Sequence, residues 1–227
     1  MKPYYQDGLC TIYHGDANAV LHKPACLASS GPWAVITDPV WPNSVPELAG
    51  ADAPKRTFDN VMGFIFDRIE WVGEVRRLVV HLGGDSDPRF LADVPKSLPF
   101  LRSVNLEYVR PHYKGRMLYT HDVAYIFGTW PKSRDGNHLI PGRVIQNDGE
   151  KRPEGHPCPR QLQHVRWLVA RLTEPDETVL DPFMGSSTTL VAAKNVGRHA
   201  IGIEIEERYC EIAAKRLSQE TLGLDVA

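Results

Sequence analysis

The fold is decided by the stretch Val179-Leu180-Asp181-Pro182-Phe183-Met184-Gly185-Ser186-Ser187-Thr188-Thr189-Leu190-Val191-Ala192-Ala193. A short apolar run, then proline, glycine and serine, then helix-forming residues predict a strand, a tight turn and a helix. The small residues allow the backbone to approach a ligand closely. The helix presents unpaired N–H groups, which Thr188 or a neighbouring serine can cap. The turn is therefore a candidate ligand site.

A second strand follows that helix and ends in an acid, in the sequence Gly197-Arg198-His199-Ala200-Ile201-Gly202-Ile203-Glu204. A carboxylate at this place can accept hydrogen bonds from both ribose hydroxyls of a nucleoside. The turn is not a GxGxxG motif, lacks the lysine of a P-loop, and contains no Arg or Lys for a pyrophosphate. These features together predict a nucleoside-containing cofactor, against the alternative of a structural turn with an ordinary helix cap.

The same alternation of apolar runs and helical patterns extends over the chain, which is typical of βαβ units and a parallel sheet. Strands are expected at 11–14, 33–37, 78–82, 101–109, 123–127, 178–180 and 199–205. Helices are expected at 59–75, 162–172, 187–195 and 207–217. The length of 227 residues suits one α/β domain with a modest insertion. The segment 131–159, rich in Gly, Pro, Asn and Asp, is expected to be a long irregular loop.

Composition sets limits on function. No apolar run approaches the roughly 18 residues of a membrane span, and residues 1–7 lack the apolar part of a signal peptide. We therefore expect a cytoplasmic protein. The four cysteines show no CxxC spacing, so neither a metal site nor a disulfide framework is expected. The net charge of −2 argues weakly against DNA binding, but 102–116 and 132–160 are locally basic, either as solvated loops or as nucleic-acid contacts.

The turn Asp181–Thr189 closely resembles the D-P-F-x-G-S-G-T-T motif of the DNA N4-cytosine/N6-adenine methyltransferases. Gly202-Ile203-Glu204 and Tyr209 also resemble that family, and His156-Pro157-Cys158-Pro159-Arg160-Gln161-Leu162 is similar to its H-P-x-x-K-P-L segment. The resemblance extends from Leu9 to about Leu217. It implies a Rossmann-like α/β methyltransferase with a mostly parallel seven-stranded sheet and helices on both faces. It also implies S-adenosyl-L-methionine as cofactor and DNA as partner, through a flipped base in duplex or a single strand.

The resemblance also assigns cofactor-binding positions. Asp181 and the turn would hold the methionine end, Glu204 the ribose, and Asp16 the adenine end, while His156 would close the pocket. The full set is Asp16, Ala17, His156, Cys158, Asp181, Phe183, Gly185, Ser186, Ser187, Thr188 and Glu204. Ser187 stands where the family has glycine. Because serine adopts positive φ less readily, we expect a slightly reshaped turn.

A second turn, Asp38-Pro39-Val40-Trp41, follows the strand expected at 33–37. Methylation of an amino group needs an acceptor for its N–H, and an aromatic ring can stack on a flipped base. We therefore assign Asp38 as acceptor, the Pro39 carbonyl as its assistant and Trp41 as the stacking ring. The family motif has a second proline where this chain has Val40, so a working but variant site is expected. The alternative is a structural Asp-Pro turn with a core Trp.

The order of the two turns matches the circularly permuted class of these enzymes, in which target recognition lies between them. The segment 131–159 is the natural candidate. Because it is short, either recognition is minimal, or the insertion 44–57 or a second subunit of a homodimer contributes. An acidic first residue in the Asp38 turn favours adenine N6 over cytosine N4. The resulting hypothesis is a site-specific DNA amino methyltransferase in a restriction–modification or phage-related setting.

Two other functions stay open. One is a methyltransferase on RNA or another amine. The other is a catalytically degenerate homologue that binds cofactor or DNA, because Val40 breaks the motif. Further polar residues have ordinary interpretations that we favour: a strand-start cap for His121-Asp122, loop flexibility for His81-Leu82-Gly83-Gly84-Asp85, and packing for the aromatic side chains His112, Tyr113 and Tyr119.

Overall fold

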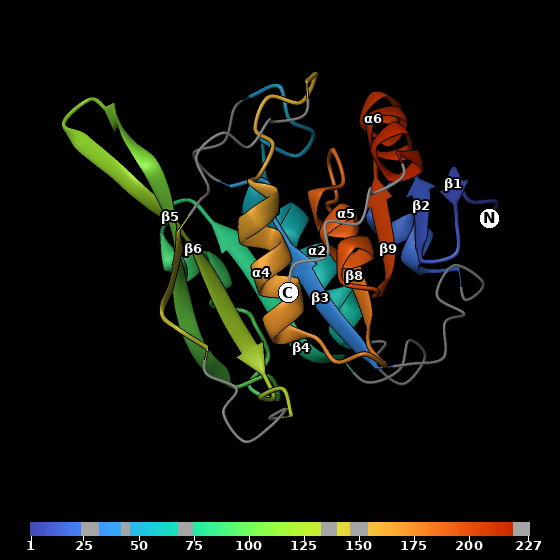
Figure 1. Cartoon of the computed structure of the whole chain (residues 1–227), viewed down its shortest axis with the longest axis horizontal. Helices are drawn as coiled ribbons and strands as arrows, with labels where there is room; N and C mark the ends of the chain where they lie inside the picture. The colour runs from blue at the N-terminus through green and yellow to red at the C-terminus, as the bar shows by residue number, and fades with distance from the viewer. Residues whose placement is uncertain (24–31, 42–45, 68–74, 133–139, 146–153, 220–227) are drawn as a thin grey trace.

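The computed structural model describes residues 1–23, 32–41, 46–67, 75–132, 140–145 and 154–219. The strands are β1 (Tyr5–Gln6), β2 (Cys10–His14), β3 (Trp33–Thr37), β4 (Val75–Leu82), β5 (Phe100–Lys114), β6 (Met117–Gly128), β7 (Arg143–Ile145), β8 (Thr178–Asp181) and β9 (His199–Glu204). The helices are α1 (Ala17–Leu21), α2 (Pro54–Asp67), the 3-10 helix η2 (Pro88–Leu91), α4 (Leu162–Leu172), α5 (Thr188–Asn195) and α6 (Glu207–Ser218). Figure 1 shows their arrangement.

The strands form one sheet in the order β1-β2-β9-β8-β3-β4-β6-β5-β7. The five neighbours β2, β9, β8, β3 and β4 are parallel, so their carboxyl ends meet at one edge of the sheet. β6 runs antiparallel to both β4 and β5. The α/β class and the mostly parallel sheet expected from the sequence are thus confirmed, and this edge is where such sheets place their ligands.

Within the described residues the sheet has nine strands, two more than the seven expected. The two additional strands are too short to show a hydrophobic period. β1 has two residues and pairs antiparallel with β2. β7 has three residues, inside the segment 131–159 that was expected to be irregular throughout, and Val144 in it pairs with Leu106 of β5. Alternating burial is not detectable in so few residues.

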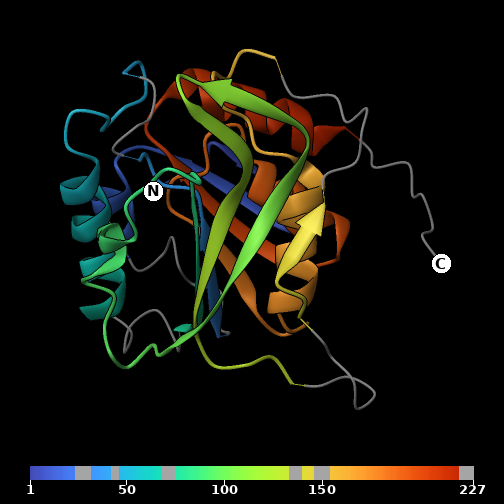
Figure 2. The ribbon, with the colours of Figure 1, turned by 90° about the vertical axis from the view of Figure 1, so that its left-hand side faces the viewer.

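Helices cover both faces of the sheet, and each face has its own core (Figure 2). Alternate residues of a strand point to opposite faces. In β4, Val79 accordingly belongs to the core beneath α4, α5 and α6, whereas Leu78 and Val80 belong to the core beneath α1 and α2. The strands buried on both faces explain the unbroken apolar runs in the sequence.

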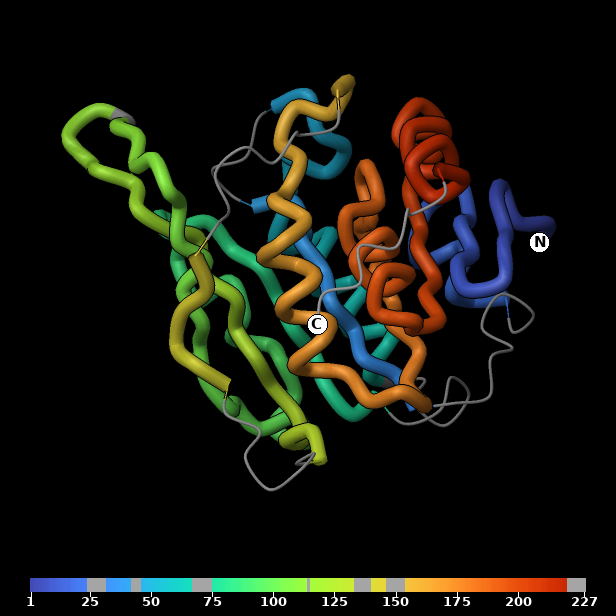
Figure 3. The backbone as a smooth tube through the Cα atoms, in the orientation of Figure 1, coloured from blue at the N-terminus to red at the C-terminus, as the bar shows by residue number. Residues whose placement is uncertain are grey.

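Several element boundaries differ from the expected ones. α2 begins at Pro54, so the predicted insertion 44–57 ends inside a helix. β5 and β6 extend as one long hairpin to the pair Lys114–Met117, and this hairpin projects from the body of the protein (Figures 1 and 3). His121 and Asp122 therefore lie within β6 rather than before a strand, which corrects the prediction of a strand-start cap. The periodicity missed the hairpin tip because its side chains are exposed on both faces.

Among the described residues, no helix combines the length and the apolar character needed to cross a membrane. Cys10 and Cys210 are buried thiols and Cys158 is a half-buried one. Cys26 lies outside the described residues. No group of three or more His, Cys, Asp or Glu side chains in the described part of the chain is arranged to hold a metal ion.

Candidate functional site

A cavity of about 490 Å³ opens at the carboxyl ends of the parallel strands. That volume is within the usual range of small-molecule sites, about 300–1,000 Å³. Both turns singled out in the sequence line this cavity, although about 140 residues separate them, because β3 and β8 are neighbours in the sheet. The assigned residues that line it are Asp16, Ala17, Asp38, Pro39, Val40, Trp41, His156, Cys158, Asp181, Phe183, Gly185, Ser186, Thr188 and Glu204.

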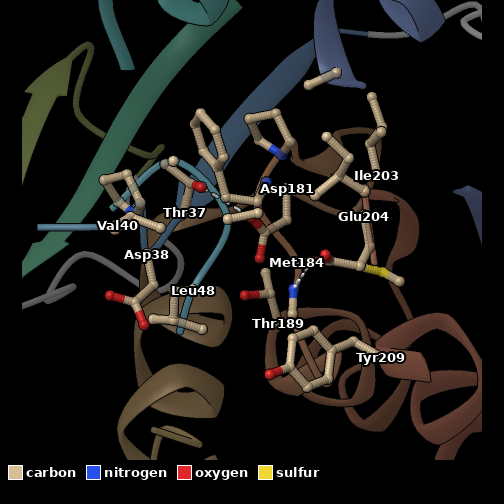
Figure 4. Close-up of a pocket in the computed structure, with 18 of the residues that line it drawn as sticks. Thr37, Asp38, Val40, Leu48, Asp181, Met184, Thr189, Ile203, Glu204 and Tyr209 are labelled. Atoms are coloured by element: carbon tan, nitrogen blue, oxygen red, sulfur yellow. Dashed lines mark hydrogen bonds between the residues drawn. The ribbon is translucent and has the colours of Figure 1, made fainter. Parts of the chain in front are cut away.

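Figure 4 shows Asp38 and Glu204 on opposite sides of the cavity, with Asp181 between them. The three carboxylates come from the ends of β3, β9 and β8, three consecutive parallel strands of the sheet. Carboxylates at these positions give the cavity an acidic floor and suit a ligand that carries positive charge and hydroxyl groups.

Asp181 is the most buried of these acids, with 1% of its surface exposed. Its Oδ1 accepts hydrogen bonds from the Thr37 hydroxyl at 2.8 Å and from the Phe183 N–H at 3.1 Å. Burial raises the pKa of Asp181 to about 7, against the opposing effect of hydrogen bonds from Thr189 and Thr37. Near neutral pH this carboxyl group therefore exists in both protonation states.

Glu204 is held by the backbone N–H groups of Gly185, Ile205 and Glu206. Gly185 N–H donates to Oε2 at 2.9 Å, the hydrogen bond drawn as a dashed line in Figure 4, and Glu206 N–H donates to Oε1 at 2.8 Å. Burial raises the pKa of Glu204 despite these bonds. A carboxylate offers about four acceptor sites, so the group keeps acceptor capacity for a ligand.

The turn between β8 and α5 is tight. Ser187 N–H donates to the Met184 carbonyl at 2.8 Å, and Met184 N–H donates to the Ile203 carbonyl at 3.1 Å. Gly185 has φ of +50°, and a Cβ at this position would lie 2.9 Å from Nε2 of His156. Glycine is required at Gly185 both by its backbone conformation and by the proximity of the His156 ring.

Ser187 is the one assigned cofactor residue that does not line the cavity. It is fully buried, and with φ of 69° it adopts the left-handed conformation that a glycine would take. Its side chain makes no capping hydrogen bond to α5, and its hydroxyl oxygen has no hydrogen-bond partner within the described residues. The expectation that a serine caps the helix is therefore wrong for Ser187. The residue carries backbone strain instead, because a non-glycine side chain is disfavoured at positive φ.

His156 and Tyr209 close one side of the cavity. Their rings are 4.5 Å apart in an edge-to-face arrangement. The Cys158 N–H donates to Nδ1 of His156 at 3.2 Å, so Nε2 carries the proton of the neutral ring. Burial lowers the pKa of His156, which favours that neutral form. Tyr209 was noted in the sequence only as part of the family pattern, without a role.

Asp16 and Ala17 stand at the other end of the cavity, after β2. Asp16 is the N-cap of α1, and its Oδ1 accepts from the Ala19 N–H at 3.0 Å. Gly15 N–H donates to the Glu204 carbonyl at 2.8 Å, which places this turn beside the end of β9. The described part of the predicted insertion also lines the cavity, through Leu48, Ala49, Gly50, Arg56 and Thr57. The insertion was predicted only as a possible contributor to recognition, without particular residues.

Arg160 forms hydrogen bonds to the Asp-Pro-Val-Trp turn. The family resemblance assigned no role to this residue. Its Nε donates to Oδ2 of Asp38 at 2.5 Å and its Nη2 to Oδ1 at 3.1 Å. Its Nη1 donates to Asp122 at 3.1 Å, and its Cζ lies 4.0 Å from the ring centroid of Trp41. Spacing could not have indicated these partners, because the Asp38–Trp41 turn, Asp122 and Arg160 come from three segments far apart in the sequence.

Trp41 is fixed from the side of β4. Its Nε1 donates to the His81 carbonyl at 3.0 Å. A Cβ on Gly83 would lie 2.5 Å from Cζ3 of Trp41, so the ring leaves room only for glycine there. Loop flexibility was the interpretation favoured for Gly83 and its neighbour, whereas the structure gives a steric reason for Gly83.

Comparisons with known proteins give matches to part of the chain. The family model described as DNA methylase matches residues 100–215. The type II methyltransferase M2.LlaDCHI of Lactococcus lactis subsp. cremoris is 33% identical over 112 residues, which are 49% of this chain and 40% of that protein. M2.DpnII of Streptococcus pneumoniae is 41% identical over 71 residues, 31% of this chain and 26% of that protein. The chain thus spans less than half the length of these curated relatives in the matched regions.

Solved structures share the fold. The M1.HpyAVI–SAM complex superposes with a TM-score of 0.68 at 24% identity, covering 92% of this chain and 100% of that one. The PvuII DNA methyltransferase, named as cytosine-N4-specific, gives a TM-score of 0.68 at 18% identity, covering 98% of this chain and 91% of that one. At these identities the likeness establishes the architecture, and the residues of the cavity must supply the argument about chemistry.

Proposed function

Because the chain belongs to the N6/N4 DNA methylase family, we propose that it transfers a methyl group from S-adenosyl-L-methionine to an exocyclic amino group of a base in DNA. One observation carries the proposal: a single cavity contains both the Asp38–Trp41 turn and the Asp181–Thr188 turn with Glu204. The names of the relatives, type II methyltransferases, favour a site-specific enzyme of the restriction–modification kind.

The described residues fit the proposed cofactor at both of its ends. Glu204 would accept the ribose hydroxyls through its remaining lone pairs, and the acidic floor would favour the positive charges of the methionine part. The Phe183–Thr188 turn would hold that part against the start of α5, with Asp181 beneath it. Asp16 and Ala17 would border the adenine ring, and His156 and Cys158 would close the cavity. When bound, the cofactor supplies an electrophilic methyl group.

The Asp-Pro-Val-Trp turn would hold the base. Asp38 would accept a hydrogen bond from the target amino group, the Pro39 carbonyl would assist it, and Trp41 would stack on the ring. Val40 lines the cavity beside them and keeps the carbonyl that a proline would offer there. Transfer between two ligands held in this way depends mainly on positioning and electrostatics.

We favour adenine N6 over cytosine N4 as the target. The support is the acid Asp38 at the first position of the turn, where serine is frequent in cytosine enzymes of the family. Mass spectrometry of nucleosides from DNA methylated by the protein distinguishes the two outcomes. N6-methyladenine is expected, and N4-methylcytosine alone would replace the adenine assignment while leaving the amino methyltransferase proposal intact.

Sequence recognition is assigned to the segment 131–159, of which the structure describes 131–132, 140–145 and 154–159. Support comes from Cys158 and Pro159, which line the cavity, and from β7, which extends the sheet beside β5. The insertion 44–57 lines the cavity as well through its described part. A second subunit would be the alternative source of recognition, and light scattering of the protein with its DNA would detect it.

The decisive experiment uses labelled S-adenosyl-L-methionine with duplex DNA, single-stranded DNA and RNA. Transfer to DNA is expected, and Asp38→Ala should abolish it while leaving cofactor binding unchanged. Asp176→Ala, at an exposed acid that precedes β8 and does not line the cavity, is the matched control and should retain transfer. Transfer to RNA alone would favour the RNA enzyme. Cofactor binding without transfer to any nucleic acid would favour the degenerate homologue. The argument for that alternative is that Val40 replaces the second proline of the family motif.

A further inference from the structure

Arg160 makes the two contacts that the proposed function assigns to the target base. Its planar guanidinium donates two N–H groups to the Asp38 carboxylate, at 2.5 and 3.1 Å. At the same time the Cζ atom lies 4.0 Å from the centroid of the Trp41 ring. An adenine or cytosine in the site would likewise present N–H groups to Asp38 while its flat ring stacked on Trp41. The guanidinium therefore mimics the part of the base that the turn recognises.

We propose that Arg160 is a displaceable occupant of the target-base position, which covers Asp38 and Trp41 until a base enters and then retains Asp122 as its partner. This inference rests on the proposed function. It adds a specificity role to it: a ligand must exchange for the guanidinium to reach the acceptor, so only a flat group with N–H donors that matches both contacts gains full affinity.

Electrostatics require that Arg160 leaves Asp38 before transfer. Positive charge develops on the amino nitrogen as it bonds to the methyl group, and Asp38 is assigned to stabilise that charge. A guanidinium bonded to the same two carboxylate oxygens would lie within a few ångströms of the reacting nitrogen and repel it. It would also neutralise the carboxylate at the moment when its charge is needed. The closed arrangement is consequently a resting state.

Asp122 provides the place to which Arg160 can retreat. This acid is 5% exposed and accepts from Nη1 of Arg160 at 3.1 Å, while its Oδ2 also lies 3.2 Å from Nε2 of His81. Although burial opposes it, the hydrogen bond to His81 and the electrostatic interactions with His81 and Arg160 hold the pKa of Asp122 well below its usual range. Asp122 thus stays anionic when Arg160 releases Asp38, and the half-buried cation is never left without a partner.

Trp41 does not have to move in this exchange. Its indole N–H is bonded to the His81 carbonyl, and its ring packs against Gly83. The stacking surface is therefore fixed on β4, while the covering residue belongs to a different segment that leads into α4. A fixed surface with a separate cover is the arrangement that displacement requires.

The first test measures binding of 2′-deoxyadenosine and 2′-deoxycytidine by calorimetry, with the cofactor site saturated by S-adenosylhomocysteine. Arg160→Ala should bind the preferred nucleoside about tenfold more tightly than the wild-type protein. The apparent affinity is proportional to the fraction of molecules whose site is open, and removal of the guanidinium opens the site in all of them. Arg166→Ala, at an exposed arginine of α4, is the matched control and should behave as wild type. Equal or weaker binding by Arg160→Ala, or no binding by either protein, overturns the proposal.

The second test adds methylguanidinium at tens of millimolar to Arg160→Ala, with urea at the same concentration as the neutral control and KCl to match ionic strength. Methylguanidinium should compete with the nucleoside and inhibit any methyl transfer, whereas urea should do neither. If methylguanidinium instead increased nucleoside binding or transfer, Arg160 would be a positioning residue and the proposal would be wrong. Arg160→Gln should show the same nucleoside affinity and the same competition as Arg160→Ala. This second variant provides the test if the alanine variant is unstable.

These readouts separate the inference from the proposed function. Nucleoside affinity and methylguanidinium competition are measured without transfer to DNA. A wild-type protein that methylates no DNA, combined with tighter binding by Arg160→Ala, would overturn the proposed reaction and retain Arg160 as the covering group. Transfer to DNA by the wild-type protein, combined with weaker nucleoside binding by Arg160→Ala, would retain the proposed reaction and overturn the covering role of Arg160.

Discussion

The hydroxyl group of Thr37 donates a 2.8 Å hydrogen bond to the buried carboxyl group of Asp181, and so links the end of β3 to the end of β8. This bond joins the strand that carries the proposed base site to the strand that carries the proposed cofactor site. Because burial raises the pKa of Asp181 to about 7, the charge at this junction changes within the physiological range.

Cofactor affinity should therefore depend on pH. A positively charged ligand favours the ionised form of Asp181, so binding should strengthen as pH rises from 6 to 8. Below pH 7 the affinity should fall by up to about tenfold per pH unit, as a single ionisation predicts. Equilibrium dialysis with labelled S-adenosyl-L-methionine, which carries the sulfonium charge, measures the effect across this range. Asp181→Asn should bind more weakly and lose the pH dependence, and an unchanged pH profile in that variant would exclude Asp181 as the group that titrates.

Glu204 should determine the affinity for the cofactor and not the affinity for the target base. Glu204→Gln removes the charge and one pair of acceptor sites, so S-adenosyl-L-methionine should bind about 10- to 100-fold more weakly, as expected for loss of hydrogen bonds to a charged group. Glu207→Gln, three residues further along on the exposed first turn of α6, is the control and should leave binding unchanged. Equilibrium dialysis with labelled cofactor measures both variants. Equal affinities for the two would remove Glu204 from the site.

Ser187 should be replaceable by glycine with a gain in stability. At φ of 69°, with a buried hydroxyl that lacks a partner in the described structure, serine is strained and poorly solvated. Ser187→Gly removes both costs and should raise the free energy of unfolding by about 1 kcal/mol, or the melting temperature by about 2–4 °C. Thermal unfolding measures this change.

Two further variants at this turn act as controls. Ser187→Ala removes the hydroxyl and keeps the strain, so its stability should lie between those of the wild-type protein and Ser187→Gly. Gly185→Ala should have the opposite effect to Ser187→Gly, because its Cβ would meet His156 at 2.9 Å. A glycine variant less stable than the wild type would contradict the argument from strain.

Val40→Pro should restore the family pattern and increase turnover. Proline narrows the backbone freedom of the turn, an effect worth about 0.4–1 kcal/mol where the conformation is compatible, so a two- to fivefold increase in kcat is expected with cofactor affinity unchanged. Steady-state kinetics on DNA measure it. A loss of both stability and activity would show that the turn needs the Val40 N–H and that its conformation differs from that of the family motif.

The cofactor half of the cavity was largely predictable from the sequence. Strand, tight turn, helix and acid follow one another within about 25 residues there, so local chemistry fixes the position of Glu204 relative to the turn. The central strands were predictable for a similar reason, since continuous apolar runs of β-branched residues seldom form anything else. The hairpin tip of β5 and β6 was not, because its length depends on pairing and not on burial.

The base half of the cavity was predictable only in part. Asp38 and Trp41 could be identified from their turn, but Arg160 and Asp122 become their neighbours through α4 and β6, and no period in the sequence encodes that contact. The steric role of Gly83 was hidden for the same reason: a glycine beside a ring from another segment has the same sequence signature as one in a flexible loop.

The position of β9 has a consequence for synthesis of the protein. Among the described strands β9 comes last along the chain, yet it lies in the sheet between the early strand β2 and β8. On a ribosome, the N-terminal strands β1 and β2 must wait for β9 to emerge before they can join the rest of the sheet. Until then the segment carrying Asp16 cannot be brought beside Asp181. A nascent chain is therefore unable to complete the proposed cofactor cavity until β9 has been translated.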